Sequence, residues 1–597
     1  PFRLEQPLGS TRPLPYHFSV GMPMGRQPPR HAQGEMSSFQ SEEQQPIRKR
    51  KADECIMGSS SGASAPASMQ MFVEDGAALE AEKVEELARL NAVIASEATG
   101  DAEALRALTK LRECFATRTH PPIQELIAVG GLAALVERLR SPSTTVLARV
   151  EVAWVLTNVA SGSSAQARAV VEAGAPEAVL AALASPDVAD RHELCDQCLW
   201  VLGNIAGDSD AAMRDALLAI GVLDALGRLF LRMPGFSWSL HERTQVLRTL
   251  TWLMSSLCRG MPAPALADVD RCFDYFGQVL VGSDDAPMLF EALWGFCYLL
   301  EGSSSQADFD ARADRMLLTG FAPGEEPPTT SPHPLLQQVL TCARRAAHDL
   351  RMPLPIPALR LLGLLVSAPA PRLTDVALAS GAVKAFCLAL VDAGAPSEVR
   401  RDAAWALSNI AAGTKEQAAA VLGDASVLDA LCGCVSGGAP HEVRRECAWA
   451  VISLAKQLGL QSCETGGTAA VDARHVLALV TAMLKDDRGE PTLQRALLDA
   501  AELVLRHGDD MRRAQCMKAN PMSRYGEELR LSDELEELQG RAEPGIQRKA
   551  AFLTRWFAAG LENRLPEKVE EKSLGFRAPS AISGDSPSRR VAYRFGA

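Results

Sequence analysis

The chain has 597 residues, of which 47% are hydrophobic and 5% aromatic, and its formal net charge is −12. An acidic chain with an isoelectric point of about 5.5 is a poor candidate for a nucleic-acid-binding protein. The sequence shows no run of about 18 apolar residues and no secretory-signal pattern at its start, so we expect neither a membrane span nor secretion.

The first segment, residues 1–78, is rich in proline and glycine and contains a basic cluster in the stretch PIRKRKADE. Proline at this density opposes a long helix, so we predict a disordered segment. Taken alone, the cluster fits a generic basic tail or a transport signal of the protein itself. It consists of Arg48, Lys49, Arg50 and Lys51.

Short helical segments then repeat along residues 79–562. Two of them read EVAWVLTNVASG (151–162) and QCLWVLGNIAGD (197–208). A period of about 40 to 47 residues is typical of armadillo or HEAT repeats, in which each unit buries its apolar face against its neighbours. The repeated frame position is occupied, in order, by Trp154, Trp200, Trp252, Trp294, Arg360, Trp405 and Trp449.

Two further segments interrupt or follow the repeats. The interval between Trp294 and Arg360 is longer than the others, and its residues 301–334 are rich in glycine, proline, serine and charged residues. This composition predicts a loop insertion. Residues 563–597 are polar and are expected to form a disordered C-terminal tail.

The fourteen cysteines are expected to be reduced thiols in an intracellular chain. Cys195 and Cys198 form a CxxC pair inside a predicted helix, and Cys432 and Cys434 form a CxC pair. Neither has a second pair at zinc spacing, so we predict buried structural thiols and neither a metal nor a cofactor.

The tryptophan and the asparagine that follows it four residues later share one face of each repeated helix. In the 151–160 helix, Trp154 and Asn158 lie off the apolar stripe, which consists of Val152, Val155, Leu156 and Val159. Trp200 and Asn204 lie off the stripe of the next repeat in the same way. The pattern predicts a ladder of indoles and amides along one side of the solenoid. The alternative is that each tryptophan packs between adjacent repeats.

The side chains of this ladder suit an extended basic peptide. An asparagine amide can both donate to and accept from a peptide backbone, and neighbouring indoles can hold the stems and charged heads of lysine or arginine. Acidic residues precede the frame position by one turn in four repeats, although ordinary surface charge is the alternative reading. The acids are Glu151, Glu291, Asp402 and Glu446, with Asp208 and Glu301 just past the motif.

These segments resemble, in order, the armadillo repeats of importin alpha, the adaptor that recognises nuclear localisation signals. The matching segments are WVLTNVASGSS, WVLGNIAGDSD, TWLMSSLCRG, ALWGFCYLLEG, PALRLLGLLVS, AAWALSNIAAG and CAWAVISLA, and the similarity covers roughly residues 79–560. The resemblance implies an all-α, right-handed superhelical solenoid of about ten armadillo repeats with disordered N- and C-terminal tails.

The resemblance also implies two signal-binding sites. The major site comprises Trp154, Asn158, Gly162, Gln197, Trp200, Asn204, Asp208, Trp252, Glu291, Trp294 and Tyr298. The minor site comprises Arg360, Asp402, Trp405, Asn409, Glu446 and Trp449. Gly162 and Asp208 are expected to hold the ammonium of the key lysine. The chain departs from the family pattern at Ala167, Ser256, Leu364 and Ser453, so we expect a somewhat weakened major site and a minor site that gains less from bipartite signals.

The implied function is a nuclear import adaptor that shuttles between cytoplasm and nucleus. Its expected partners are cargo proteins with basic signals, importin beta, and a nuclear export receptor that uses the final repeats and the tail. By the same resemblance, Arg48, Lys49, Arg50 and Lys51 belong to an importin-beta-binding segment that folds back as an autoinhibitor.

Two rival functions remain open. An armadillo scaffold of the catenin type would serve signalling or adhesion, but such a groove binds acidic partners, whereas acids accompany the ladder here. An enzyme is not expected, because the sequence contains no phosphate loop, HExxH motif or Gly-rich dinucleotide turn. The SxxK string from Ser453 to Lys456 has no companion motif, and we attribute it to chance.

Overall fold

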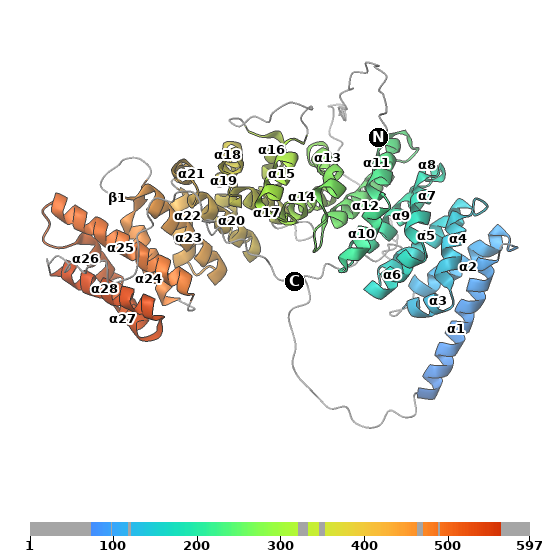
Figure 1. The fold of residues 1–597 in the computed structure, drawn as a ribbon, viewed down its shortest axis with the longest axis horizontal. Helices are drawn as coiled ribbons and strands as arrows, with labels where there is room; N and C mark the ends of the chain where they lie inside the picture. Colours follow the sequence, from blue (N-terminus) through green and yellow to red (C-terminus); the bar gives the residue numbers. More distant parts are fainter. Residues whose placement is uncertain are drawn as a thin grey trace, which may run out of the picture. The chain divides into compact units, whose positions relative to one another are not determined.

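The computed structural model describes residues 73–96, 98–116, 121–319, 332–345, 353–424, 426–461, 470–486 and 490–562. The predictions for residues 1–72 and 563–597, including those for Arg48, Lys49, Arg50 and Lys51, lie outside these described residues. The described part is all-α apart from one small ribbon, so the predicted fold class is confirmed (Figure 1).

One row of ten helices in the described residues includes the seven helices that carry the repeated frame, and we call it the ladder row. Each member packs against the next along the chain, which is the stacking expected of a solenoid. The row consists of α2 (Asp101–Ala116), α5 (Val146–Ala160), α9 (His192–Ala206), α12 (Leu240–Cys258), α14 (Ala286–Glu301), α17 (Pro355–Ser367), α20 (Ser397–Ala411), α23 (His441–Leu458), α25 (Pro491–Ala514) and α28 (Pro544–Leu561).

A second row of ten described helices packs against the ladder row. Its neighbours touch along most of its length, and an edge-to-face contact of Phe230 with Tyr275, 5.4 Å between ring centroids, joins its fourth and fifth members. The row consists of α1 (Val73–Ala95), α4 (Gly131–Arg140), α7 (Ala175–Ala184), α11 (Val222–Arg232), α13 (Leu266–Gly282), α16 (Pro334–Ala343), α19 (Ala382–Val391), α22 (Ser426–Ser436), α24 (Ala473–Lys485) and α27 (Leu531–Arg541).

Short elements connect the two rows. They are α3 (Ile123–Ala128), α6 (Ser164–Glu172), α8 (Asp187–Asp190), α10 (Ala211–Ala219), η3 (Met233–Gly235), α15 (Gln306–Leu317), α18 (Pro371–Ser380), α21 (Lys415–Val421) and α26 (Pro521–Glu528). The parallel strands β1 (Leu460–Gln461) and β2 (Val471–Asp472) pair between α23 and α24.

Local sequence explains where these helices begin and end. The Thr145 side chain caps α5 by accepting from the backbone N–H of Ala148, and Ser163 forms a capping box with Gln166 at the start of α6. Gly174 separates α6 from α7 with a φ of 76°, a left-handed conformation that costs a glycine little. Gly221 repeats this turn between α10 and α11 with a φ of 74°.

The core is the continuous seam between the two rows. The predicted apolar stripe of α5 lies in it, and Val152, Val155, Leu156 and Val159 are all fully buried. Burial of one such side chain contributes about 1.5–3 kcal/mol relative to leaving it exposed. The predicted structural thiols Cys195 and Cys198 are also fully buried, as expected.

The prediction of a loop throughout residues 301–334 is wrong for Gln306–Leu317, which forms α15. Its charged composition conceals a buried face, because Arg312 is only 2% exposed and donates to the backbone oxygens of Leu299 and Pro264 at 3.1 and 3.0 Å. Ser305 caps the helix by accepting from the N–H of Asp308. The buried position is therefore occupied by an arginine that donates to backbone carbonyls, where an apolar residue would ordinarily be expected.

No single helix of the described residues has the length and apolar character needed to cross a membrane. Two bent pairs, α18 with α19 and α21 with α22, meet these criteria only when both helices of the pair are taken together.

Candidate functional site: the tryptophan–asparagine ladder

The seven frame residues lie on seven successive helices of the ladder row. Because these helices pack in chain order, each frame residue is one rung of a ladder. The rungs are Trp154 on α5, Trp200 on α9, Trp252 on α12, Trp294 on α14, Arg360 on α17, Trp405 on α20 and Trp449 on α23. The sequence frame thus places the predicted residues in register.

The rungs differ in how far they are buried. Trp154, Trp200 and Trp252 are each 7% exposed, whereas Trp294, Trp405 and Trp449 are half-buried. The prediction that the Trp/Asn line stands off the core is wrong for Trp154, Trp200 and Trp252, which are buried with the core, and for Asn158 and Asn204, which are 5% and 0% exposed. Packing between repeats, the alternative considered for these residues, is therefore part of what the indoles do.

The Trp200 and Trp252 indoles pack directly against each other. Their ring centroids are 5.0 Å apart with planes inclined by 45°. Gly203 permits this contact, because a Cβ atom built there would lie 2.1 Å from Cζ3 of Trp252. Gly363 plays the same part for Trp405, with a corresponding distance of 2.7 Å. Each of these glycines leaves room for the indole of the next helix in the row. This role was not predicted from the sequence, although both glycines lie three residues after the frame residue.

The ladder asparagines hydrogen-bond to helix carbonyls. Nδ2 of Asn158 donates to the carbonyl oxygen of Trp154 at 2.8 Å, and Asn409 donates to that of Trp405 at 3.0 Å. Asn204 donates across the helix interface to the carbonyl oxygen of Thr157 at 3.0 Å. A primary amide has two N–H donors and an acceptor oxygen, so these bonds use part of the hydrogen-bonding capacity of Asn158 and Asn409, whereas Asn204 is fully buried. Their predicted contact with a peptide backbone stays a prediction.

Serines and backbone N–H groups hold the acids of the central rungs. Asp208, just beyond the end of α9, accepts from Oγ of Ser164 at 2.7 Å and from the backbone N–H of Asp210 at 2.9 Å. Glu291, which is 7% exposed, accepts from Oγ of Ser255 at 2.7 Å. Hydroxyl and backbone N–H donors are neutral, so these hydrogen bonds hold the two carboxylates without adding a positive charge beside them.

Two further predicted residues lie beside these rungs. Gly162 lies between the end of α5 and the capping box of α6. A Cβ atom at this position would lie 2.0 Å from Oε1 of Gln166. Gln197 is 8% exposed, and its Oε1 is buried with no hydrogen-bond partner among the described residues. An unsatisfied buried amide oxygen is costly and favours contact with an added donor.

An arginine of the chain itself occupies the Trp154 rung. Nε of Arg112, on α2, lies 2.7 Å from Oε2 of Glu151, and the guanidinium carbon lies 5.9 Å from the centroid of the Trp154 ring. Burial raises the pKa of Glu151, and the charge of Arg112 opposes that rise. A cation therefore already rests against this indole and its acid.

The same pairing recurs through the C-terminal rungs. Nε of Arg360 lies 2.7 Å from Oε1 of Glu301, with its guanidinium carbon 5.3 Å from the Trp405 ring centroid. Arg401 pairs with Asp402 at 3.1 Å, and Arg445 pairs with Glu446 at 2.8 Å. Burial raises the pKa of Glu446 and Arg445 opposes it. The acids predicted to select a basic ligand thus have arginine partners within the chain.

Between these two regions, Trp294 and Tyr298 stack face to face with ring centroids 5.6 Å apart and an interplanar angle of 20°. Among the departures from the family pattern, Leu364 is 8% exposed and belongs to the core. Ser256 is 5% exposed, Ala167 is fully buried and Ser453 is half-buried. Leu364 has no polar atom beyond its backbone, so this rung offers no side-chain amide clamp.

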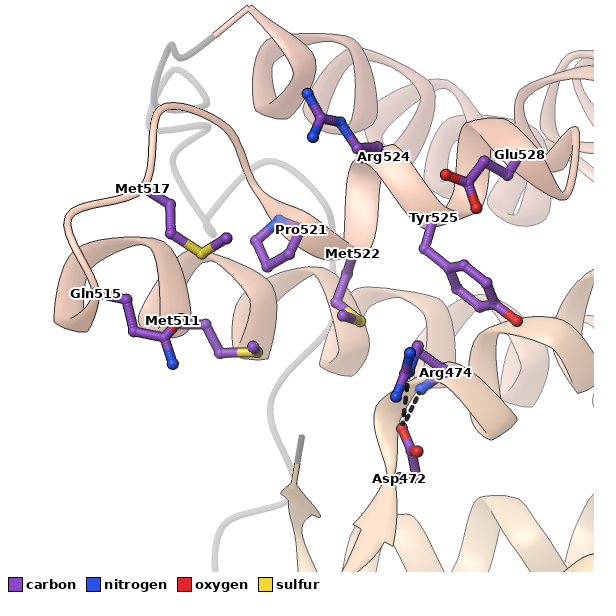
Figure 2. A pocket seen from close by; sticks show the side chains of 10 residues that line it. All are labelled: Asp472, Arg474, Met511, Gln515, Met517, Pro521, Met522, Arg524, Tyr525 and Glu528. Carbon is purple, nitrogen blue, oxygen red and sulfur yellow. Dashed lines mark hydrogen bonds and ion pairs between the residues drawn. The ribbon is translucent and has the colours of Figure 1, made fainter. Parts of the chain in front are cut away.

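Two cavities lie away from the ladder residues. One, of about 490 Å³, is lined by α11, α12 and α13. The other, of about 300 Å³, lies at β2, α24, α25 and α26, and its lining includes Met511, Met517, Met522 and Tyr525 (Figure 2). Asp472 and Arg474 face this second cavity as an ion pair. No group of three or more metal-ligating side chains in the described residues could hold a metal ion.

Curated relatives of this chain are importin alpha subunits. It is 33% identical over 214 residues to importin subunit alpha-1b of Oryza sativa subsp. japonica, which is 36% of this chain and 37% of that protein. It is 34% identical over 203 residues to importin subunit alpha-2 of Arabidopsis thaliana, which is 34% of this chain and 35% of that protein. A longer match, 26% over 354 residues, covers 58% of this chain and 60% of importin subunit alpha-9 of Arabidopsis thaliana. The chain thus spans little more than a third of the length of the first two relatives.

No protein-family model matches the chain. Among solved structures, the crystal structure of an engineered protein aligns with a TM-score of 0.58 over 80% of this chain and 99% of its own, at 18% sequence identity. At that identity the likeness shows the fold alone. The sequence matches and the repeat solenoid together describe an importin-alpha-like armadillo-repeat protein.

Proposed function

We propose that this chain is a nuclear import adaptor whose ladder binds lysine- and arginine-rich segments in an extended conformation. The observation that carries the proposal is the contact between the Trp200 and Trp252 indoles, together with Asp208 just beyond the end of α9. Two indoles in contact offer apolar and π surface, and the Asp208 carboxylate is held by a serine hydroxyl and a backbone N–H, bonds that add no positive charge to it. This combination suits a lysine side chain.

The wider role follows from the relatives rather than from the ladder. We propose that the bound segment is the nuclear localisation signal of a cargo, that importin beta carries the complex, and that an export receptor returns the adaptor from nucleus to cytoplasm. The importin alpha relatives support this scheme. Within it, the rungs from Trp154 to Trp294 form the major site and those from Arg360 to Trp449 form the minor site.

The decisive experiment compares two peptides of equal length on the full chain by fluorescence anisotropy. One is a lysine-rich signal peptide, and the other carries glutamate at every lysine position. We expect the basic peptide to bind at least about 100-fold more tightly, because the ladder acids repel the acidic one. Preference for the acidic peptide would instead support a scaffold of the catenin type and remove the transport proposal.

The basic cluster Arg48, Lys49, Arg50 and Lys51 is proposed as an autoinhibitor that competes with the signal through a high effective concentration. Deletion of residues 1–60 should then tighten binding of the signal peptide. A matched chain with all four residues replaced by serine should behave like the deletion. Equal affinities of all three chains would rule out autoinhibition by this cluster.

A further inference from the structure

The larger cavity marks a place where the two rows of helices separate. Every other second-row helix in the described residues packs closely on its ladder-row partner, whereas α11 lies further from α12 and from α13, the next member of its own row (Figure 1). The space between these three helices has a volume of about 490 Å³. We call it the α11–α13 cavity.

The α11–α13 cavity has an apolar floor. Phe230 of α11 and Tyr275 of α13 meet edge to face, with their ring centroids 5.4 Å apart, and three buried side chains complete the floor. The floor thus consists of Leu226, Phe230, Leu250, Met254 and Tyr275. An apolar group that enters such a cavity gains free energy, because both surfaces are removed from water.

Gly227 leaves part of this cavity unfilled. It lies in the interior of α11, where a glycine weakens a helix relative to alanine. A Cβ atom built there would meet only Nη1 of Arg271, at 4.0 Å, so the surrounding structure has room for a side chain. Neither close packing nor a left-handed backbone requires glycine at this position. The missing side chain therefore keeps the cavity open to a group from outside the chain.

An exposed leucine lies at the rim of the same cavity. Leu231, in the last turn of α11, lines the cavity and is 78% exposed. Two further apolar side chains on the neighbouring helices are also exposed. Leu240, at the start of α12, is 81% exposed, and Val281, near the end of α13, is 66% exposed. Apolar side chains that are this exposed on adjacent elements indicate an association surface.

The charged residues on the rim of the cavity carry both signs. Oδ1 of Asp224, on α11, lies 2.9 Å from Nη1 of Arg271 on α13. Oδ2 of Asp274 lies 2.7 Å from Nη2 of Arg315. Arg228 is exposed and forms no ion pair within the part of the chain that the structure describes. Charges at a protein surface are screened within about 8 Å at physiological ionic strength, so this mixed rim matters more to an approaching molecule than the net charge of −12.

A second copy of this chain has the matching chemistry. A rim that carries both signs can face a copy of itself, with the Arg228 guanidinium of each copy beside a rim carboxylate of the other. A strongly acidic or strongly basic partner would instead meet like charges on part of the rim. A surface with a protruding leucine and an apolar cavity side by side is also self-complementary about a two-fold axis, because each copy provides what the other receives.

We propose that the α11–α13 cavity is a self-association surface through which two copies of this chain form a two-fold dimer. Leu231 of each copy enters the cavity of the other and covers the rings of Phe230 and Tyr275. The space that Gly227 leaves accommodates the leucine side chain. The apolar side chains form the dry centre of the interface, and the rim charges pair around them.

This surface is separate from the ladder. Leu250 and Met254, on the floor of the cavity, lie on the opposite face of α12 from Trp252, because two residues along a helix correspond to a rotation of about 200°. Trp252 contacts Trp200 within the ladder. Dimer formation therefore does not depend on the proposed transport function, and a lysine-rich peptide should leave the dimer unchanged.

The first test is sedimentation velocity of the full chain between about 1 and about 100 µM. We expect a monomer–dimer equilibrium with a Kd on the order of 10 µM, as for a small and reversible interface. Leu231→Asp should raise this Kd at least about 100-fold, because each dimer loses two apolar contacts and gains two buried charges. Leu388→Asp, at a 49% exposed position on α19, is the matched control and should leave the Kd unchanged.

Gly227→Gln separates loss of the surface from loss of the fold. The new side chain fits the helix and fills the cavity, so we expect a monomer whose urea midpoint is no lower than that of the unchanged chain. Benzoylphenylalanine in place of Leu231 should cross-link to α11, α12 or α13 of the other copy, which mass spectrometry of mixed isotope-labelled and unlabelled chains identifies.

Three results would overturn the proposal. The first is a chain that stays monomeric at about 100 µM, which would leave the cavity to a different protein. The second is a dimer that neither Leu231→Asp nor Gly227→Gln weakens. The third is a set of cross-links confined to single copies, which would assign the cavity to another segment of the same chain.

Discussion

The central rungs and the C-terminal rungs of the ladder share one sequence frame, but their carboxylates contact different kinds of side chain. At the central rungs, Trp200, Trp252 and Trp294, the carboxylates of Asp208 and Glu291 accept from serine hydroxyls. At the C-terminal rungs, Arg360, Trp405 and Trp449, the acids pair with Arg360, Arg401 and Arg445.

This difference shows that a repeated motif does not guarantee a repeated affinity. A hydrogen bond from a serine hydroxyl brings no positive charge to a carboxylate, whereas a cation that approaches an ion pair must share or displace an arginine. The proposed binding energy should therefore concentrate at the central rungs.

The largest effect is expected from Trp200→Ala combined with Asp208→Lys. The change removes one indole of the contacting pair and reverses the charge beside it, so affinity for a single basic cluster should fall at least about 100-fold. Fluorescence anisotropy with a lysine-rich peptide measures the change.

The matched control for this pair is Asp190→Lys, which reverses an exposed charge away from the ladder. It should leave affinity nearly unchanged. Because Trp200 is only 7% exposed, circular dichroism must show that the double variant retains its helices, and Asp208→Lys alone provides a variant without a packing defect. An unchanged affinity in a folded double variant would contradict the major-site assignment.

The next effect is on the free energy of unfolding, and it compares the two glycines that leave room for an indole, Gly203 and Gly363. Gly203→Ala should destabilise the chain by about 1–3 kcal/mol, because the new methyl group would overlap the Trp252 ring. Gly363→Ala should cost less, since its Cβ would lie 2.7 Å from the Trp405 ring instead of 2.1 Å. Urea unfolding midpoints of the full chain measure both changes.

Gly540→Ala provides the control for these substitutions, because a Cβ atom at this helical position meets nothing within 4 Å. It should be neutral or stabilising by up to about 1 kcal/mol. If all three variants unfold at the same urea concentration, the glycines do not seat the indoles.

The ladder frame could be predicted from sequence because it depends on local periodicity. Successive helices with the same apolar stripe must stack alike, so one frame position defines one rung after another. The frame tryptophans do lie on successive helices of the row. Their degree of burial was not predicted correctly, because the packing of Trp154 depends on neighbouring repeats whose spacing a single helix does not reveal.

The missed features depend on contacts across repeats. Gly203 weakens a helix when considered alone and acquires its role only when Trp252 lies against it. Arg360 and Glu301 are far apart in the sequence, and neither segment contains a pattern that predicts their ion pair. Helix α15 was not predicted because one of its buried positions is occupied by Arg312, where an apolar residue would have indicated a helix packed on the core.

A smaller effect is expected from Arg360→Gln. The change releases Glu301 and uncovers the face of Trp405, so the C-terminal rungs should bind a basic cluster up to about fivefold more tightly. The readout is the ratio of affinities for a bipartite and a single-cluster peptide. Arg372→Gln, which breaks an exposed ion pair with Asp314 outside the ladder, should leave the ratio unchanged. A lower ratio in Arg360→Gln would show that this arginine helps to bind the ligand.

The smallest effect is expected from Ser453→Asn, which restores an amide one turn after Trp449. One added hydrogen bond at a half-buried position contributes about 0.5 kcal/mol, so bipartite peptides should bind about two- to threefold more tightly by calorimetry. Ser436→Asn, at an exposed position on α22, is the control. A gain confined to bipartite peptides would locate their second cluster at the C-terminal rungs. An equal gain for single-cluster peptides would mean that the central and C-terminal rungs do not divide the ligand as proposed.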